Sequence, residues 1–254
     1  MCIRDRRIRR SLAYRKFRAY ERQLYPRFDQ CLVTSALDRE RIAAYIPLLP
    51  QQIGLVPNGV DLAHYRPDFH QDGRQGLVFS GALTYGPNRD AMEHFLSRIY
   101  PAIQASAPET GLTITGSTAG VRLKSLRSNG HVRFTGHVDD IRPVVAGAAV
   151  CVVPLRQGAG TRLKILEAMA LGTPVVSTSK GAEGLEVRSE EHLLIADDAD
   201  QFAEHTLRLL RSPQLRARLA AKAYDLMLEK YDWAKIRAGF RQLVEQVHGR
   251  AAHG

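Results

Sequence analysis

One segment of the sequence combines residue types that could bind a phosphate and a sugar hydroxyl. A Gly-Ala-Gly stretch at residues 158–160 leads into a helix that we expect to begin at Thr161. The free N–H groups of a first helical turn and the positive end of the helix dipole attract anions, and Arg162 and Lys164 add positive charge there. Glu167 follows Lys164 by three residues, which places both side chains on one helix face. A cation beside a diphosphate and a carboxylate that accepts ribose hydroxyls would together bind a nucleotide.

The same helix also has a purely structural interpretation. Leu163, Leu166 and Ala170 recur at helical spacing and would pack on a sheet while the charged side chains stay in water. The local pattern alone leaves both interpretations open.

The elements that must position this helix alternate regularly between strand and helix after residue 76. Such alternation is typical of a parallel sheet covered by helices on both faces, and the continuous apolar run 148–153 fits a strand buried on both sides. The sequence therefore predicts the α/β class, with a doubly wound parallel sheet followed by C-terminal helices. We expect strands at 77–80, 112–115, 132–135, 150–155, 175–178 and 193–196, and helices at 89–100, 121–127, 139–145, 161–171, 200–211, 213–230 and 233–247.

In a doubly wound sheet, ligands bind in the crevice at the carboxyl ends of the strands. Every loop expected at that edge contains glycine, which lets the backbone approach a phosphate closely. These loops are 81–88, 116–120, 136–140, 156–161 and 179–185.

Composition limits the classes of protein to consider. The chain has 254 residues, of which 44% are hydrophobic and 24% charged, as in ordinary folded domains. Because no run of about 18 apolar residues occurs, no membrane-spanning helix is expected. The three cysteines lie far apart, which argues against a disulfide framework or a CxxC metal site and favours a reducing, cytoplasmic compartment.

The net charge of +10 is concentrated near the N-terminus. Ten of the 36 basic residues lie between Arg4 and Arg27, against two acidic residues, so the remaining chain is close to neutral. A helix is expected from Arg7 to Tyr25, ending at Pro26. Its basic face could be solvated, could contact anionic lipid or could bind nucleic acid. The segment lacks the stacking aromatic residues of an RNA-recognition module, and we expect no nucleic acid.

The stretch from residue 28 to residue 76 is more irregular. A strand is expected at 31–34, followed by a helix that Ser35 caps and that runs to about Tyr45. Another strand is expected at 53–57, and the exposed stretch that follows is rich in turn residues and is interpreted as a linker.

Several motifs together resemble glycosyltransferase family 4, whose members have the two-domain GT-B fold. The segment 156–176 resembles the family's donor-binding loop and helix, and residues 56–61 with 65–67 resemble its link into the C-terminal domain. The resemblance extends from about Asp29 to the C-terminus. Its other motifs are Val33-Thr34-Ser35 with Asp38-Arg39, Phe79-Ser80-Gly81, Pro87-Asn88-Arg89-Asp90-Ala91 and Phe134-Thr135-Gly136-His137-Val138.

The resemblance implies transfer of a sugar from a nucleotide-sugar donor, with retention of anomeric configuration and without a metal ion or other cofactor. Glu167 matches the second glutamate of the family's Glu-x7-Glu pattern, which binds the donor ribose. The first glutamate would fall at Ala159, a departure that bears on recognition of the donor sugar. Gly160, Thr161 and Arg162 match the loop whose backbone faces the donor phosphates and sugar.

The first loop of the donor site also departs from the family pattern. Ala82 follows Gly81 where the family has an arginine, and Asn88 stands near the usual lysine. Arg162 and Lys164 are therefore the candidates for neutralising the diphosphate.

The resemblance further implies that Gly136, His137 and Val138 border the nucleobase, mainly through backbone atoms. A solvated loop histidine is an equally good interpretation of His137.

An Asp-x-Asp pattern at Asp198-Ala199-Asp200 resembles a metal–diphosphate motif, but it stands where a helix is expected to begin. Acidic residues cap helix N-termini favourably, so we interpret this pattern as a cap. No pair of histidines has metal-binding spacing, and no metal site is predicted.

We expect the C-terminal, donor-binding half of a GT-B glycosyltransferase. Residues 1–58 would be a remnant of the acceptor domain, 59–75 a linker and 76–230 the donor-binding domain, with the helix 231–254 packing back towards the acceptor domain. The acceptor, a sugar or a lipid-linked acceptor, would bind to the part of the N-terminal acceptor domain that this sequence is expected to lack. We therefore assign no catalytic residue and expect no turnover by this fragment alone.

Two alternatives remain at this stage. The first is a non-catalytic membrane-surface or scaffold module that keeps the fold, an interpretation supported by Ala159. The second is a sugar-nucleotide epimerase of GT-B architecture.

Because the family often uses lipid-linked acceptors, residues 4–27 are also expected to meet an anionic membrane surface, as a peripheral contact at the inner face of the cell membrane.

Overall fold

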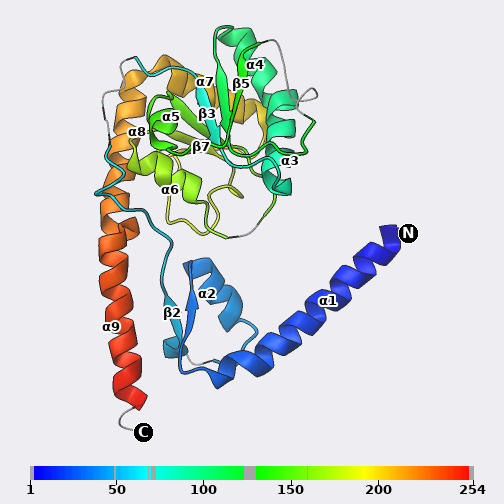
Figure 1. Ribbon diagram of the computed structural model, residues 1–254, viewed down its shortest axis with the longest axis vertical. Helices are drawn as coiled ribbons and strands as arrows, with labels where there is room; N and C mark the ends of the chain where they lie inside the picture. Colours follow the sequence, from blue (N-terminus) through cyan, green and yellow to red (C-terminus); the bar gives the residue numbers. More distant parts are fainter. Residues whose placement is uncertain are drawn as a thin grey trace. The chain divides into compact units, whose positions relative to one another are not determined.

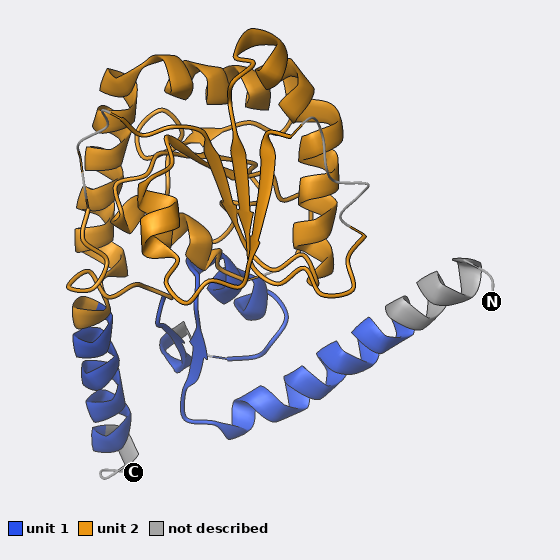
Figure 2. Ribbon diagram, turned by 45° about the horizontal axis from the view of Figure 1, so that its top comes forward, with its two compact units in different colours: residues 1–57, 236–254 blue, residues 58–235 orange. Residues whose placement is uncertain are grey.

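The computed structural model describes residues 3–48, 50–67, 69, 73–122, 130–158 and 160–251. The contacts divide the chain into two compact units, one of Met1–Pro57 with Ile236–Gly254 and the other of Asn58–Lys235 (Figure 2). None of the described helices contains a stretch long and apolar enough to cross a membrane.

The larger unit is built on a sheet of six strands, all parallel, in the order β5-β4-β3-β6-β7-β8 (Figure 1). The chain starts in the middle at β3, moves outward to β5, and then crosses to β6 and moves outward in the other direction. This reversal between β3 and β6 is the place where doubly wound sheets bind ligands. The strands are β3 (Leu77–Ser80), β4 (Leu112–Thr115), β5 (Val132–Gly136), β6 (Val150–Val153), β7 (Val175–Ser177) and β8 (Leu194–Ile195).

Helices cover both faces of this sheet, which confirms the predicted α/β class. In β6 the side chains of Val150 and Val152 enter one hydrophobic core and those of Cys151 and Val153 enter the other, and all four are fully buried. Each buried valine contributes about 1.5–3 kcal/mol relative to exposure, so this strand anchors both layers. The helical segments of the unit are α3 (Gly86–His94), η3 (Phe95–Ile99), α4 (Tyr100–Ser106), α5 (Arg142–Ala146), α6 (Leu163–Ala170), α7 (Ala199–Arg211), α8 (Pro213–Leu226), η5 (Met227–Tyr231) and the start of α9 (Trp233–Ala251).

The first helix after β3 is longer than predicted. It begins at α3 with Pro87 in its first turn, a position where the missing N–H has no cost. It then continues through the π-helical segment η3 into α4. Pro101 in the first turn of α4 cannot donate to the preceding turn, which accounts for the change of helical pitch there. The helix predicted at 121–127 falls mostly outside the described residues.

The helix α6 begins two residues later than predicted, at Leu163 instead of Thr161. Arg162 stands at its N-cap with a non-helical backbone conformation, φ −89° and ψ 88°, and its side chain makes no capping hydrogen bond. Gly160 has a φ of +83°, in the left-handed region, so the loop still turns at this point. Thr161 and Arg162 therefore belong to the loop and not to the first helical turn.

Part of the segment predicted as a linker packs on the larger unit. Val60 and Leu62 are buried in its second core. The backbone of Val60 accepts a hydrogen bond from Trp233 N at 3.0 Å and donates one to Tyr231 O at 2.9 Å. These bonds join the beginning of the unit to the end of η5.

The smaller unit contains a strand–helix–strand motif and a long basic helix. Its two strands pair in parallel, Cys31 opposite Ile53, and Ser35 caps the intervening helix by accepting a bond from Asp38 N at 3.1 Å. The buried carboxylate of Glu21 accepts hydrogen bonds from the hydroxyl groups of Tyr25 and Tyr45, which hold the long helix on the motif. The elements are α1 (Ile3–Leu24), η1 (Tyr25–Arg27), β1 (Cys31–Val33), α2 (Ala36–Ala43), η2 (Pro50–Gln52), β2 (Ile53–Leu55) and the part of α9 that begins at Ile236.

Candidate functional site

A cavity of about 340 Å³ opens at the carboxyl ends of β3, β4 and β5, next to α6. It lies beside the reversal of strand order, where the sequence predicted a ligand. Five of the residues that line it are predicted site residues: Gly81, His137, Val138, Lys164 and Glu167. The complete lining is Ser80, Gly81, Thr115, Gly116, His137, Val138, Ile141, Lys164 and Glu167.

Close packing of two loop backbones shapes the floor of this cavity. Gly116 has a φ of +102°, and a Cβ atom added to it would lie 2.6 Å from Ala82 N. Real side chains do not tolerate such a distance, so the loops after β3 and β4 approach this closely only because residue 116 is glycine. The Gly116 N–H also donates to Gly136 O at 2.7 Å, which joins the loop after β4 to the end of β5.

Lys164 is the cation of the cavity. Its Nζ donates a hydrogen bond to Asn88 Oδ1 at 3.0 Å and lies 4.0 Å from the centre of the buried Phe79 ring. Burial lowers the pKa of Lys164 to about 8, with the nearby thiol of Cys151 and the carboxylate of Glu167 opposing the shift and Arg162 adding to it. The ammonium has therefore lost much of its hydration and stands to gain from contact with an anion.

Glu167 is the carboxylate of the cavity, one turn further along α6. Its Oε1 accepts a long hydrogen bond, 3.5 Å, from the hydroxyl of Tyr65. Burial raises the pKa of Glu167, and the Tyr65 hydroxyl and the Lys164 ammonium oppose that rise. The carboxylate is thus only weakly satisfied by the protein, which leaves acceptor capacity for the hydroxyl groups of a ligand.

The residues just before α6 do not line this cavity in the described part of the chain. Arg162 is 9% exposed, and its guanidinium turns back over Gly158, where an added Cβ would lie 2.9 Å from Nη2. Thr161 Oγ1 is a buried atom with no hydrogen-bond partner among the described residues. Gly160 has open space where a side chain would be. Ala159 lies outside the described residues.

The predicted nucleobase border lies at the end of β5. Gly136 has a φ of +72°, and Val138 lines the cavity. The side chain of His137 is 83% exposed and lies 3.9 Å from Asp139 Oδ1. His137 therefore borders the cavity from a solvated loop.

Three residues that support the site are not among the predicted site residues. Tyr65 reaches Glu167 across 102 positions of sequence, and Phe79 supports Lys164 from β3. Both belong to motifs of the family resemblance, Tyr65-Arg66-Pro67 and Phe79-Ser80-Gly81, which predict a link and a strand end but no contact with α6. Asn88 departs from the family pattern, and the sequence alone assigns it no role.

The Asp-x-Asp pattern caps a helix as predicted. Asp198 Oδ1 accepts a hydrogen bond from Gln201 N at 2.8 Å at the start of α7. Asp197 accepts two hydrogen bonds from Ser179, at 2.8 Å and 2.7 Å. Within the described ranges, no group of three or more His, Cys, Asp or Glu side chains is placed to hold a metal ion.

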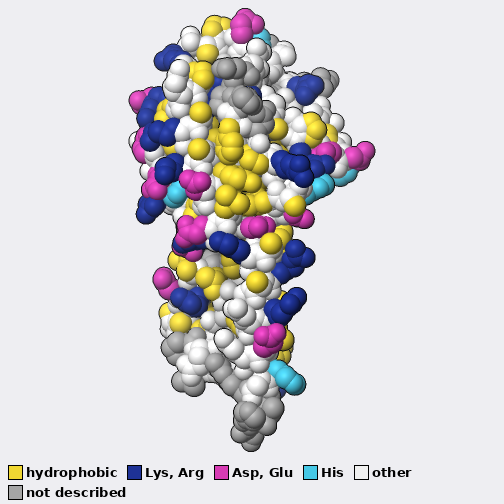
Figure 3. Space-filling view, turned by 90° about the vertical axis from the view of Figure 1, so that its left-hand side faces the viewer, with side chains coloured by type: hydrophobic (Ala, Val, Ile, Leu, Met, Phe, Trp, Pro, Cys, Tyr) yellow, Lys and Arg dark blue, Asp and Glu magenta, His cyan; other side chains and the backbone are white. Residues whose placement is uncertain are grey.

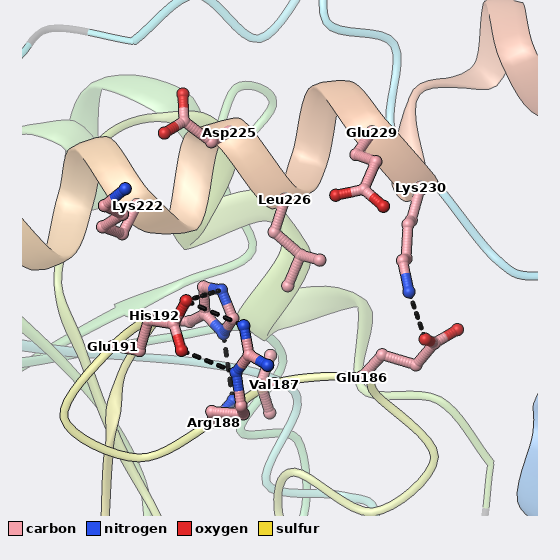
Figure 4. A pocket seen from close by; sticks show the side chains of 10 residues that line it. All are labelled: Glu186, Val187, Arg188, Glu191, His192, Lys222, Asp225, Leu226, Glu229 and Lys230. Carbon is pink, nitrogen blue, oxygen red and sulfur yellow. Dashed lines mark hydrogen bonds and ion pairs between the residues drawn. The ribbon is translucent and has the colours of Figure 1, made fainter.

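A second cavity of the larger unit, about 530 Å³, lies between α8–η5 and the segment 186–192 (Figure 4). Its charged side chains are mostly paired with one another: Arg188 with Glu191 at 2.6 Å, and Lys230 with Glu186. The guanidinium of Arg188 holds the pKa of Glu191 below its usual value. Charges of both signs are also interspersed on the face shown in Figure 3. This cavity shares no lining residue with the first one.

Known proteins resemble this chain in sequence and in fold. The phosphatidyl-myo-inositol mannosyltransferase of Mycolicibacterium smegmatis is 31% identical over 202 residues, which cover 76% of this chain and 52% of that protein. The chain spans about half the length of the first curated relatives that it matches, 52%, 43% and 53%.

Two solved structures share the fold. Sucrose-phosphate synthase from Thermosynechococcus elongatus superposes with a TM-score of 0.71 at 23% identity, over 86% of this chain and 58% of that chain. Anabaena Alr3699/HepE in complex with UDP-glucose superposes with a TM-score of 0.71 at 15% identity, over 91% of this chain and 67% of that chain. The parallel α/β fold is therefore that of GT-B-like glycosyltransferases.

The family model described as "Glycosyl transferases group 1" matches residues 74–212. That range contains the sheet and every residue that lines the first cavity. The chain therefore belongs to the group 1 glycosyl transferases.

Proposed function

We propose that this chain binds the nucleotide-sugar donor of a family 4 glycosyltransferase, as the C-terminal half of the enzyme. The observation that carries this proposal is the position of Lys164 and Glu167, which face one cavity from one helix at the carboxyl edge of the sheet. In a nucleotide the diphosphate is joined to the 5′ carbon of the ribose, so a cation and a carboxylate one helical turn apart can contact the diphosphate and the ribose hydroxyls of one molecule.

Each predicted residue then has a role in donor binding. Lys164 contacts the diphosphate, while the free N–H groups at the start of α6 add favourable dipoles. Glu167 accepts the ribose hydroxyls. Gly81 allows the donor to approach the loop after β3 closely. The nucleobase lies against Gly136, His137 and Val138.

The loop before α6 meets the donor phosphates and sugar. Gly160 and Thr161 contribute backbone N–H groups, and Arg162 adds positive charge through its guanidinium, which lies against Gly158. Ala159 leaves the sugar without the carboxylate that the Glu-x7-Glu pattern would supply, so donor-sugar selectivity rests on other groups.

The chemistry expected of the whole enzyme is electrostatic. Transfer to a sugar or lipid-linked acceptor builds negative charge on the departing diphosphate, and Lys164 with the α6 N-terminus stabilises it without a metal ion. Retention of anomeric configuration is expected from the family resemblance. Groups that bind the acceptor come from outside the donor site, so this chain alone binds the donor but does not complete the reaction. The named relatives favour this function over a scaffold or an epimerase.

Calorimetry with a panel of nucleoside diphosphates, namely UDP, GDP, ADP, CDP and dTDP, tests the proposal. We expect measurable affinity for at least one of them, and weaker affinity after Glu167→Ala. Absence of binding across the panel, or the same affinity in the variant, would contradict the assignment.

We also propose that residues 4–27 meet an anionic membrane surface at the inner face of the cell membrane. The observation in favour is that Phe17 and Tyr20 of α1 are 61% and 58% exposed, on a helix with many basic residues. Amphipathic helices of this composition bind lipid surfaces, with about 1 kcal/mol per cation near anionic headgroups. The wild-type chain should co-sediment with vesicles of phosphatidylserine and phosphatidylcholine, whereas the double variant Phe17→Ser/Tyr20→Ser should stay in the supernatant. Equal sedimentation of both would contradict this contact.

A further inference from the structure

Asn88, in the first turn of α3, is a polar residue that contacts Lys164 of the donor cavity but does not line that cavity, and the motif that contains it assigns it no role. Its side chain is 9% exposed and extends from α3 towards α6, between the loop after β3 and the Lys164 ammonium. A buried amide needs partners for both its oxygen and its NH₂ group, and the identity of those partners shows what the residue does.

Both ends of the Asn88 amide are engaged. Its Nδ2 donates to the carbonyl oxygen of Ala82 at 2.9 Å, and its Oδ1 accepts from Lys164 Nζ at 3.0 Å. A carbonyl can only accept and an ammonium can only donate, so the two contacts fix the amide in one orientation. Because the loop carbonyl holds one end, the other end holds the lysine in place.

Gly81 makes room for this arrangement. It has a φ of +147°, and a Cβ atom added to it would lie 2.7 Å from Asn88 Nδ2 and 2.7 Å from Lys164 Nζ. Any larger residue at position 81 would push the amide and the ammonium apart. Phe79, two residues earlier, places its ring 4.0 Å from the same ammonium.

The charge of residue 88 matters as much as its shape. An amide is neutral, so it accepts a hydrogen bond from Lys164 without cancelling the positive charge. A carboxylate at the same place would form an ion pair with Lys164 and would compete with an incoming phosphate. Of the three N–H donors of Lys164, one goes to Asn88, which is its hydrogen-bond acceptor among the described residues.

We propose that Asn88 is a positioning residue, which holds the Lys164 ammonium at the cavity wall with its charge uncancelled, ready for the diphosphate of the donor. The proposal rests on the function proposed above. In this proposal the neutral amide of Asn88 contacts the Lys164 ammonium and does not contact the donor itself.

Two variants separate this role from simple packing. In Asn88→Asp the carboxylate stabilises the ammonium, so the pKa of Lys164 should rise, while affinity for a nucleoside diphosphate near pH 7 should fall about tenfold. In Asn88→Ala the ammonium loses an acceptor, so its pKa should fall further below the usual lysine value and affinity should fall several-fold, about threefold to tenfold. The two pKa shifts have opposite signs, which a packing defect would not produce.

The measurement combines NMR titration of the Lys164 Cε–H signal, assigned with Lys164→Met, with calorimetry of the nucleoside diphosphate that binds the wild type best. Arg89→Ala, on the exposed side of α3, is the matched control and should leave both quantities unchanged. Thermal unfolding and circular dichroism check that each variant folds.

The outcomes are distinct for the two proposals. If the wild type binds no nucleoside diphosphate and no inorganic pyrophosphate, the proposed function fails. If the wild type binds but both Asn88 variants keep the wild-type Lys164 titration and affinity, the positioning role of Asn88 is overturned while the donor site stands. Weaker binding with the same Lys164 titration in both variants also overturns it, because packing alone then accounts for the loss.

Discussion

Both cavities described above are lined with charged side chains, but burial dominates the pKa values in one of them and ion pairing in the other. In the donor cavity, burial moves the pKa of Lys164 down and that of Glu167 up, each towards its neutral form. In the second cavity, ion pairing moves the pKa of Lys230 up and that of Glu191 down, each towards its charged form.

This difference indicates which cavity is prepared for a ligand. Charges that have lost water without gaining a strong partner carry an unfavourable energy, which an oppositely charged ligand relieves. Charges already paired at the surface gain little from a ligand, because binding would first have to break the pair. More charged residues line the second cavity than the first, so the number of charges alone would point to the second cavity as the ligand site.

The largest effect that separates the two cavities is expected from Lys164→Met. Loss of one charge-assisted contact to the diphosphate should reduce nucleoside diphosphate affinity by about tenfold to hundredfold. Calorimetry measures this loss. An affinity within about twofold of the wild type would show that Lys164 does not contact the diphosphate.

The same substitution should raise the thermal midpoint of the protein without ligand. The pKa of Lys164 is about 8 in the folded protein, below the usual 10.5. The folded state therefore binds fewer protons than the unfolded state between these values, and the ionised side chain opposes folding below them. Methionine has a similar shape and no charge, so differential scanning calorimetry at neutral pH should show the increase. A lower midpoint would mean that the ammonium is well stabilised in the free protein.

Glu167→Gln should have a smaller effect, about threefold to tenfold on affinity, because an amide still accepts hydrogen bonds but without charge. A matched pair of ligands locates the contact: the wild type should prefer a ribonucleoside diphosphate over its 2′-deoxy form, and the variant should show a weaker preference. Loss of affinity with an unchanged preference would place Glu167 away from the ribose.

Lys230→Ala, in the second cavity, should have the smallest effect. It removes an exposed pair with Glu186, and such pairs contribute about 0–1 kcal/mol to stability. Nucleoside diphosphate affinity should be unchanged, and urea unfolding should show a shift within that range. A large loss of affinity would show that the two cavities are not independent.

All six strands of the sheet could be predicted, with bounds that differ by at most two residues at an end, whereas the site could be predicted only in part. β3 and β4 begin and end at the predicted residues, because β-branched and apolar residues are typical of strands and turn residues follow them. The pairing of Lys164 with Glu167 follows from local spacing, because residues three positions apart lie on the same face of a helix. The meeting of Tyr65 with Glu167 and of Asn88 with Lys164 depends on tertiary packing across 102 and 76 positions, which no local pattern encodes.

The start of α6 shows a different limit of sequence patterns. Thr161 has the residue type of an N-cap, and the glycines before it suggest that a helix follows at once. The chain instead stays non-helical through Arg162, whose guanidinium packs against Gly158. Burial of one long side chain therefore outweighs the local capping preference.

The most direct test of a desolvated lysine at the centre of the donor site is the pH dependence of nucleoside diphosphate affinity, measured by calorimetry from about pH 7 to 9.5, above the last phosphate pKa of about 6. In the proposed function the protonated ammonium binds the diphosphate, so affinity should be constant near pH 7 and should fall as the pH rises through about 8, the pKa of Lys164. Lys164→Met should bind more weakly and show no such fall. A flat profile for the wild type, or the same fall in both proteins, would contradict the account.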